Sequence, residues 1–257
     1  MKKKKRRKLK LWVKNTLLIL LLLILLALVI IYIFKDNTPK ITKEKIISLT
    51  KKEEKNFYYE ELSSSIKTKI TGKTFPKEFD SHYQKITYDD LRYIKIKYYD
   101  FEGIIHNDGE LIVHKEVAEE VLDIFYKLYK AKYPFTKIKL VDEYNGNDEL
   151  SMQDNNTSAF NYRLLEDSTE LSWHAFGIAI DINPLYNPYI LGNKIYPSTA
   201  KDYTNRNQNF KGKIDHNDLA YKLFTEQGWK WGGDFQNSKD YQHFYKEIFK
   251  DEIRRRK

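Results

Sequence analysis

One apolar run near the N-terminus dominates the hydrophobic pattern of the chain. Residues Thr16 to Phe34 form 19 consecutive positions without a charged residue, a proline or a glycine. At a helical rise of about 1.5 Å per residue, this run reaches about 28 Å, close to the hydrocarbon thickness of a bilayer. The pattern therefore predicts one transmembrane helix at residues 16–34.

The residues on either side of this run predict its orientation. Residues 1–15 hold nine basic residues and no acidic one, whereas Lys35 alone follows the run directly. The positive-inside rule makes residues 1–15 a basic cytoplasmic tail and places the rest of the chain outside the cell. A cleaved signal peptide is the alternative, but its apolar core is about 7–15 residues long and ends at a small-residue site. We therefore favour an uncleaved, single-pass anchor in the cell membrane.

The pattern changes after the apolar run. Residues 35–65 are rich in lysine and glutamate and poor in apolar positions, which predicts a spacer before an extracytoplasmic domain at residues 66–257. Alternating or short apolar runs predict strands in the second half of residues 86–100 and at residues 111–113, 135–141 and 178–182. Helical spacing of apolar positions predicts helices at residues 115–133 and 219–227. Because these elements show no regular βαβ repeat, we expect an α+β fold.

The charge distribution argues against one class of partner. The net charge of +9 suggests nucleic-acid binding at first sight, but ten of the 45 basic residues lie in residues 1–35. The rest of the chain holds 35 basic and 36 acidic residues, so its near neutrality argues against a nucleic-acid-binding surface. The chain has no cysteine, which excludes disulfides, thiolate zinc ligands and cysteine nucleophiles.

A histidine and an aspartate are the first candidates for metal binding. His174 and Asp181 lie in the segment SWHAFGIAID, in which Gly177 permits a close approach of the backbone. Asp181 falls in an apolar, strand-like run, where an unpaired carboxylate is costly, so we expect it to contact a cation or strong donors. His174 can offer a neutral imidazole nitrogen to the same cation. Catalytic zinc usually takes three protein ligands, so a third is expected elsewhere.

His243 is the third candidate ligand, and Asp240 precedes it by three residues. At that spacing both side chains can face one centre, with His243 binding a metal and Asp240 taking a proton from a metal-activated water. A structural explanation stays open for each residue at this point. A histidine beside aromatic residues is often simply packed, and an aspartate in a strand often pairs with an arginine.

Two segments of the chain resemble a family of peptidases. Residues 155–181 and 229–244 are similar to the zinc D-alanyl-D-alanine carboxypeptidases of the VanY type and to the related L-alanyl-D-glutamate endopeptidases. The shared pattern is SxHxxGxAxD, followed far downstream by an acid, two residues and a histidine. The fixed positions of the first part are all present, as Ser172, His174, Gly177, Ala179 and Asp181.

The resemblance implies a role for each candidate residue. It implies that His174, Asp181 and His243 bind zinc, that Asp240 is the catalytic base, and that Arg163 contacts the substrate or the developing oxyanion. It also implies a small α+β domain in which an antiparallel sheet and packed helices surround the zinc. Peptidoglycan stem peptides are the substrates that this family implies.

Two positions depart from the pattern of the relatives. Tyr245 stands where relatives often have glutamate, and Asp240 stands where many D-alanyl carboxypeptidases have a glutamate base. The aspartate is more similar to the endopeptidase branch, so an L-alanyl-D-glutamate endopeptidase is one alternative. A non-catalytic, zinc-containing cell-wall-binding module is another. We favour the carboxypeptidase because a membrane-tethered domain suits the trimming of newly made stem peptides.

Overall fold

The computed structural model of the chain describes residues 56–83, 86–165 and 168–248. These residues belong to one compact unit, Lys52–Lys257. The predicted cytoplasmic tail and the predicted transmembrane helix at residues 16–34 lie outside the described residues. In the part of the chain that is described, no helix is both long enough and apolar enough to cross a bilayer.

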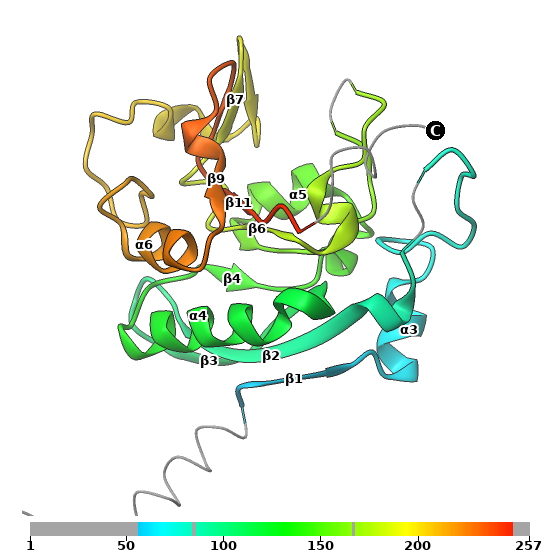
Figure 1. Cartoon of the computed structure of the whole chain (residues 1–257). Helices are drawn as coiled ribbons and strands as arrows, with labels where there is room; N and C mark the ends of the chain where they lie inside the picture. Colours follow the sequence, from blue (N-terminus) through cyan, green and yellow to red (C-terminus); the bar gives the residue numbers. More distant parts are fainter. Residues whose placement is uncertain (1–55, 84–85, 166–167, 249–257) are drawn as a thin grey trace, which may run out of the picture. The chain divides into compact units, whose positions relative to one another are not determined.

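The described residues form an α+β fold with mainly antiparallel sheets (Figure 1), as the interspersed sequence pattern predicts. Three three-stranded sheets have the orders β1-β2-β3, β6-β11-β9 and β10-β7-β8, all antiparallel, and β4 pairs with β5 in parallel. The strands are β1 (Tyr58–Glu61), β2 (Leu91–Tyr99), β3 (Ile105–His114), β4 (Lys137–Ile138), β5 (Asn156–Thr157), β6 (Ala179–Asp181), β7 (Tyr189–Leu191), β8 (Lys194–Tyr196), β9 (Lys230–Trp231), β10 (Lys239–Asp240) and β11 (His243–Tyr245).

Short helices connect these sheets. The α-helices are α3 (Ser64–Ile70), α4 (Ala118–Lys130), α5 (Asp148–Gln153) and α6 (Leu219–Glu226). The 3-10 helices are η1 (Tyr88–Asp90), η2 (Lys115–Val117), η3 (Val141–Tyr144), η4 (Trp173–Phe176), η5 (Ala200–Tyr203) and η6 (Gly232–Asp234). The predicted helices at residues 115–133 and 219–227 correspond to η2 with α4 and to α6, so both are confirmed.

Helix α4 covers one face of the β1-β2-β3 sheet (Figure 1). Its apolar stripe is fully buried and includes Val121, Ile124, Phe125 and Leu128. Strand β2 alternates buried and partly exposed residues over most of its length, as expected for a sheet with one covered face. The amphipathic periodicity in the sequence therefore arises from this helix-on-sheet layer.

A strand forms before the predicted domain boundary at residue 66. Strand β1 lies inside the segment predicted as a spacer and pairs with β2 along its whole length. All four of its residues are exposed, so it has no apolar alternation by which the sequence could indicate a strand. Phe57 and Leu62, which flank it, are buried in the core and hold it in place.

Aromatic contacts link this layer to the small central sheet β6-β11-β9. Phe125 of α4 contacts Phe224 of α6 with ring centroids 6.4 Å apart, and Phe224 stacks on Phe244 of β11 at 4.6 Å. Because successive side chains of a strand point to opposite faces, packing Phe244 into the core turns its neighbour His243 to the other face. The core thereby determines the direction in which His243 points.

Candidate metal centre and active site

Strands β6 and β11 bring Asp181 and His243 together. The two residues are direct partners in the antiparallel register, although 62 residues separate them in the sequence. Directly opposed side chains on one face of a sheet lie close together, and here Nδ1 of His243 is 2.9 Å from Oδ1 of Asp181. Both residues are buried, with 7% and 4% of their surface exposed. The pairing of β6 with β11 therefore brings together two of the three predicted metal ligands.

His174 reaches the same point from η4. Ser172 caps this helix by accepting a hydrogen bond from the backbone N–H of His174 at 3.2 Å, which explains the serine of the motif. Gly177 ends the helix with φ of 67°, and a Cβ atom there would lie 2.7 Å from the backbone nitrogen of His114. The motif serine and glycine therefore shape the turn that directs His174 inward.

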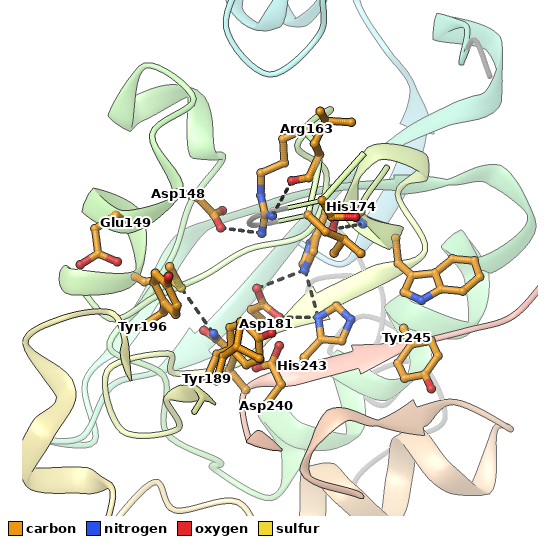
Figure 2. Close-up of a pocket in the computed structure, with 18 of the residues that line it drawn as sticks. Asp148, Glu149, Arg163, His174, Asp181, Tyr189, Tyr196, Asp240, His243 and Tyr245 are labelled. Atoms are coloured by element: carbon orange, nitrogen blue, oxygen red, sulfur yellow. Dashed lines mark hydrogen bonds and ion pairs between the residues drawn. The ribbon is translucent and has the colours of Figure 1, made fainter. Parts of the chain in front are cut away.

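The three side chains converge on one point (Figure 2). Nε2 of His174 lies 3.1 Å from Oδ2 of Asp181 and 3.1 Å from Nδ1 of His243. Nδ1 of His174 lies 2.5 Å from the carbonyl oxygen of Ala159. A carbonyl oxygen only accepts, so Nδ1 carries a proton, and loss of the Nε2 proton directs a lone pair at the cluster. Burial lowers and the negative charge of Asp181 raises the pKa of His174, and the net shift is upward, so a cation that binds here displaces the Nε2 proton.

This donor set fits a divalent cation. One ligand atom from each of the three residues lies within 4.8 Å of the other two, and two nitrogens with one carboxylate oxygen form a common set for catalytic zinc. Burial opposes ionisation of Asp181, but the two histidines hold the pKa of this carboxyl well below its ordinary value. Burial also lowers the pKa of His243. An ionised carboxylate and a neutral imidazole are the forms in which these groups bind metal.

Asp240 lies beside this cluster on β10. Its residue is partly exposed, but Oδ1 is buried and has no hydrogen-bond partner among the described residues. Burial, followed by the negative charge of Asp181, raises the pKa of Asp240 well above its ordinary value. The missing side chain of Gly232 allows Asp240 to pack closely against it, because a Cβ atom there would lie 2.7 Å from the Cβ and the carbonyl oxygen of Asp240. A carboxyl with a raised pKa in such a position is a candidate for proton transfer.

Arg163 lies on the opposite wall of the site and is held by Asp148. Nη2 of Arg163 is 2.5 Å from Oδ2 of Asp148, and Nη1 donates to the carbonyl oxygen of Leu164 at 3.3 Å. Nε of Arg163 is buried and has no partner among the described residues. Asn161 supports the pair through a 3.5 Å contact with Oδ1 of Asp148. The guanidinium is therefore held in place beside the cluster.

All five predicted site residues line one cavity of about 810 Å³ (Figure 2). On one side of the cluster lies Tyr245, whose ring stacks on that of Trp173 with centroids 5.7 Å apart. On the other side lie the stacked rings of Tyr189 and Tyr196, also 5.7 Å apart. The cavity is thus lined by aromatic pairs on both sides of the candidate metal site.

Several lining residues were not identified from the sequence. Glu149, Tyr189, Tyr196 and Phe235 line the cavity, and they come from α5, from the β7–β8 hairpin and from the loop after η6. The hairpin strands are only three residues long, so their pattern is too short to be recognised locally. Tyr245 stacks on His243 at 5.5 Å and on Trp173. It belongs to an aromatic wall beside the cluster.

Comparison with family models supports this interpretation of the site. Residues 166–246 match the sequence model of the D-alanyl-D-alanine carboxypeptidase family. The predicted family resemblance is confirmed. Comparison with curated proteins and with solved structures gave no significant match. The matched segment contains His174, Asp181, Asp240 and His243, whereas Arg163 lies just before it. The match therefore supports a peptidase of the carboxypeptidase type.

Proposed function

We propose that this protein is a zinc peptidase that hydrolyses peptidoglycan stem peptides, with D-alanyl-D-alanine carboxypeptidase as its principal activity. The observation that carries the proposal is the convergence of His174, Asp181, His243, Asp240 and Arg163 on one cavity. The family match supplies the reaction class. The site would face the cell wall if residues 16–34 anchor the chain with its N-terminus in the cytoplasm, as we also propose.

His174, Asp181 and His243 would hold the zinc. When bound there, zinc supplies Lewis-acid polarisation of the scissile carbonyl and a water molecule whose pKa is lowered to about 7. We assign the remaining steps of the reaction to side chains of the protein. The carbonyl of Ala159 fixes the tautomer and orientation of His174, as the outer contacts of metal-binding histidines commonly do.

Asp240 is positioned to move protons in this reaction. Its unpaired Oδ1 lies beside the cluster, and its raised pKa favours proton uptake. We assign to it the acceptance of the proton from the attacking water and the return of that proton to the departing amine. Both transfers occur at one carboxyl group, as general acid–base catalysis allows.

Arg163 supplies fixed positive charge. The ion pair with Asp148, at 2.5 Å, favours a fixed position of the guanidinium at the cavity wall. We assign to it the stabilisation of negative charge on the substrate, either at a terminal carboxylate or at the oxygen of the scissile carbonyl. The first target suits a carboxypeptidase, and the second suits either branch of the family.

An L-alanyl-D-glutamate endopeptidase is the second candidate. Two observations favour it, namely the aspartate at position 240 and the extension of the cavity toward Trp173 and Tyr245 beyond the cluster. Mass spectrometry of a stem pentapeptide after incubation with the zinc-loaded protein distinguishes the two activities. Loss of one terminal alanine indicates the carboxypeptidase, and cleavage after the first residue indicates the endopeptidase. An intact peptide would overturn both and favour a zinc-containing binding module.

A further inference from the structure

Arg206 is a half-buried cation to which the proposed reaction gives no role. It lies in the loop between η5 and α6 and is not among the residues that line the cavity. Burial lowers the pKa of its guanidinium to about 10, whereas Tyr241 and Asp215 oppose this shift, so the group stays charged at neutral pH. Removing a charge from water is costly unless other contacts compensate for it. The contacts of Arg206 therefore indicate what the residue does.

The guanidinium connects its own loop to the segment that precedes β7. Nη1 donates to the carbonyl oxygens of Tyr186 at 2.8 Å and of Tyr203 at 3.3 Å. Nη2 donates to Oδ1 of Asn187 at 2.9 Å and to the carbonyl oxygen of Ile214 at 2.9 Å. Each of these acceptors is uncharged, so the planar guanidinium joins several backbone segments while it keeps its positive charge.

The positive charge of Arg206 lies over the ring of Tyr241. The guanidinium carbon is 4.3 Å from the ring centroid, a distance at which the face of a tyrosine attracts a cation. Tyr241 directly follows Asp240, and its backbone nitrogen donates to the carbonyl oxygen of Pro188 at 3.3 Å. Arg206 therefore contacts both the segment just before β7 and the residue just after β10.

The strand pair beside these contacts is short. β10 is two residues long and pairs with β7 through Lys239 with Ile190 and through Asp240 with Tyr189. Figure 2 shows Tyr189 beside Asp240. So short a pair of strands is at best marginally stable by itself. Contacts at its end, such as those of Arg206, therefore decide how firmly β10 is held.

Other contacts hold the strands that carry the predicted metal ligands. Nδ2 of Asn187 donates to the carbonyl oxygens of Ile182 at 3.3 Å and of Asn183 at 3.2 Å, just after β6. The backbone nitrogen of Ile182 donates to the carbonyl oxygen of Gln242 at 3.0 Å, which extends the pairing of β6 with β11. None of these bonds involves Arg206. Its loss should therefore loosen β10 more than β6 and β11.

We propose that Arg206 is a positioning residue that holds Asp240 at the candidate metal centre through Tyr241. The inference rests on the proposed peptidase function and adds a residue outside the cavity to the proton transfer assigned to Asp240. A displacement of about 1 Å in a reacting group can lower a rate roughly a hundredfold. Arg206 would therefore affect kcat, and neither substrate binding nor the zinc content would depend on it.

The kinetic test uses Arg206→Met, which keeps the apolar stem of the side chain and removes its charge and donors. For the zinc-loaded full-length protein and a stem pentapeptide, we expect kcat to fall roughly 10- to 100-fold, with KM and bound zinc per chain unchanged. Arg92→Met is the matched control, because Arg92 donates to the carbonyl oxygens of Asp89 at 3.0 Å and Leu91 at 2.8 Å, away from the cavity. It should keep the wild-type kcat. A wild-type kcat in Arg206→Met, or a fall that lost zinc explains, would overturn the proposal.

Tyr241→Leu tests the same contact from its other side. This variant removes the ring and leaves Arg206 unchanged, so it carries the test if Arg206→Met does not fold. We expect the same fall in kcat. In the double variant both changes remove one contact, so kcat should fall no further than in the single variants. A double variant in which the two single effects multiply would contradict a route through Tyr241.

Hydrogen–deuterium exchange separates this proposal from the proposed function, because it needs no substrate. Amide exchange in residues 239–242 should be roughly tenfold faster in Arg206→Met than in the wild-type protein, as for the loss of one cation–π contact, and exchange in residues 243–246 should be unchanged. If the wild-type protein leaves the pentapeptide intact while exchange changes in this way, the peptidase function fails and the hold of Arg206 on β10 stands. Unchanged exchange in residues 239–242 would refute that hold.

Discussion

Asp181 and His243 are direct register partners on β6 and β11, and their side chains meet with Nδ1 and Oδ1 2.9 Å apart. The candidate metal site therefore depends on the pairing of these two strands. A slip of one residue would turn one of the two side chains to the opposite face of the sheet. The stacking of Phe244 on Phe224 in the core opposes such a slip.

Zinc binding is expected to stabilise the fold. Three buried polar groups converge on one point, so an ion that binds them only in the folded state raises the free energy of unfolding. The gain is about 2.7 kcal/mol when free zinc exceeds its dissociation constant a hundredfold. Thermal unfolding with zinc and with a chelator measures this effect. His243→Ala should abolish the shift, whereas His216→Ala, which removes an exposed histidine outside the cavity, should keep it.

Asp148 is expected to act through Arg163. Asp148→Asn removes the charge that holds the guanidinium at 2.5 Å, so the arginine loses its fixed position. We expect kcat/KM on the pentapeptide to fall roughly tenfold, mainly through KM, as for the loss of one charge-assisted contact. Asp154→Asn is the control, because Asp154 pairs with Lys137 and Tyr144 outside the cavity. Unchanged kinetics in Asp148→Asn would show that the ion pair has no part in substrate binding.

Substitution of Gly177 tests whether the turn at the end of η4 determines the position of His174. In Gly177→Ala, the new Cβ atom would lie 2.7 Å from the nitrogen of His114 at a φ of 67°. We expect a loss of about 1–3 kcal/mol of stability and weaker zinc binding. Gly192 has a similar φ of 57°, but a Cβ atom there would have no neighbour within 4 Å. Gly192→Ala therefore measures the effect of backbone strain without a steric clash. Equal zinc affinity in both variants would argue against a role of this turn in the metal site.

Asp218 makes the stability of the fold depend on pH. It caps α6 and accepts a hydrogen bond from Tyr133, and its burial raises its pKa to about 6. The folded state therefore holds this proton more tightly than the unfolded state, so stability is lost as the pH rises from about 4 to 6. Asp218→Asn keeps the acceptor without the charge.

Urea unfolding across pH measures the contribution of Asp218. We expect Asp218→Asn to match the wild-type protein near pH 4 and to exceed its free energy of unfolding by roughly 1–3 kcal/mol above pH 7. Asp215→Asn is the comparison, because the pKa of Asp215 is lowered by its contacts, so its removal should reduce stability above pH 4. A pH-independent difference between Asp218→Asn and wild type would contradict this assignment.

Local patterns in the sequence were sufficient to predict the longer helix and strand elements of the fold, such as α4 and β2. The apolar stripe of α4 and the alternation in β2 result from one covered face of a sheet, and both elements form where they were predicted. Strand β1 has no such pattern because all its residues are exposed, and its position depends on pairing with β2. The strands β7, β8 and β10 are two or three residues long, so no local period can identify them.

Some site residues could likewise be predicted from local sequence patterns, and others could not. The spacing within SWHAFGIAID places His174 and Asp181 near each other through one turn, which is a local property. The meeting of Asp181 with His243 depends on strand pairing across 62 residues, so the family motif was needed to connect them. The hold of Asp148 on Arg163 and the contact of Arg206 with Tyr241 depend on three-dimensional packing that a single sequence does not encode as a pattern.

The most direct test of the account combines zinc content and pentapeptide turnover in Asp240→Asn. The variant leaves His174, Asp181 and His243 unchanged and removes the group assigned to proton transfer. We expect one bound zinc per chain, as in the wild-type protein, and a kcat reduced by about 10²–10⁴-fold, the usual contribution of a general base. Turnover at the wild-type rate with zinc retained would contradict the central claim that this cavity is a zinc peptidase active site using Asp240.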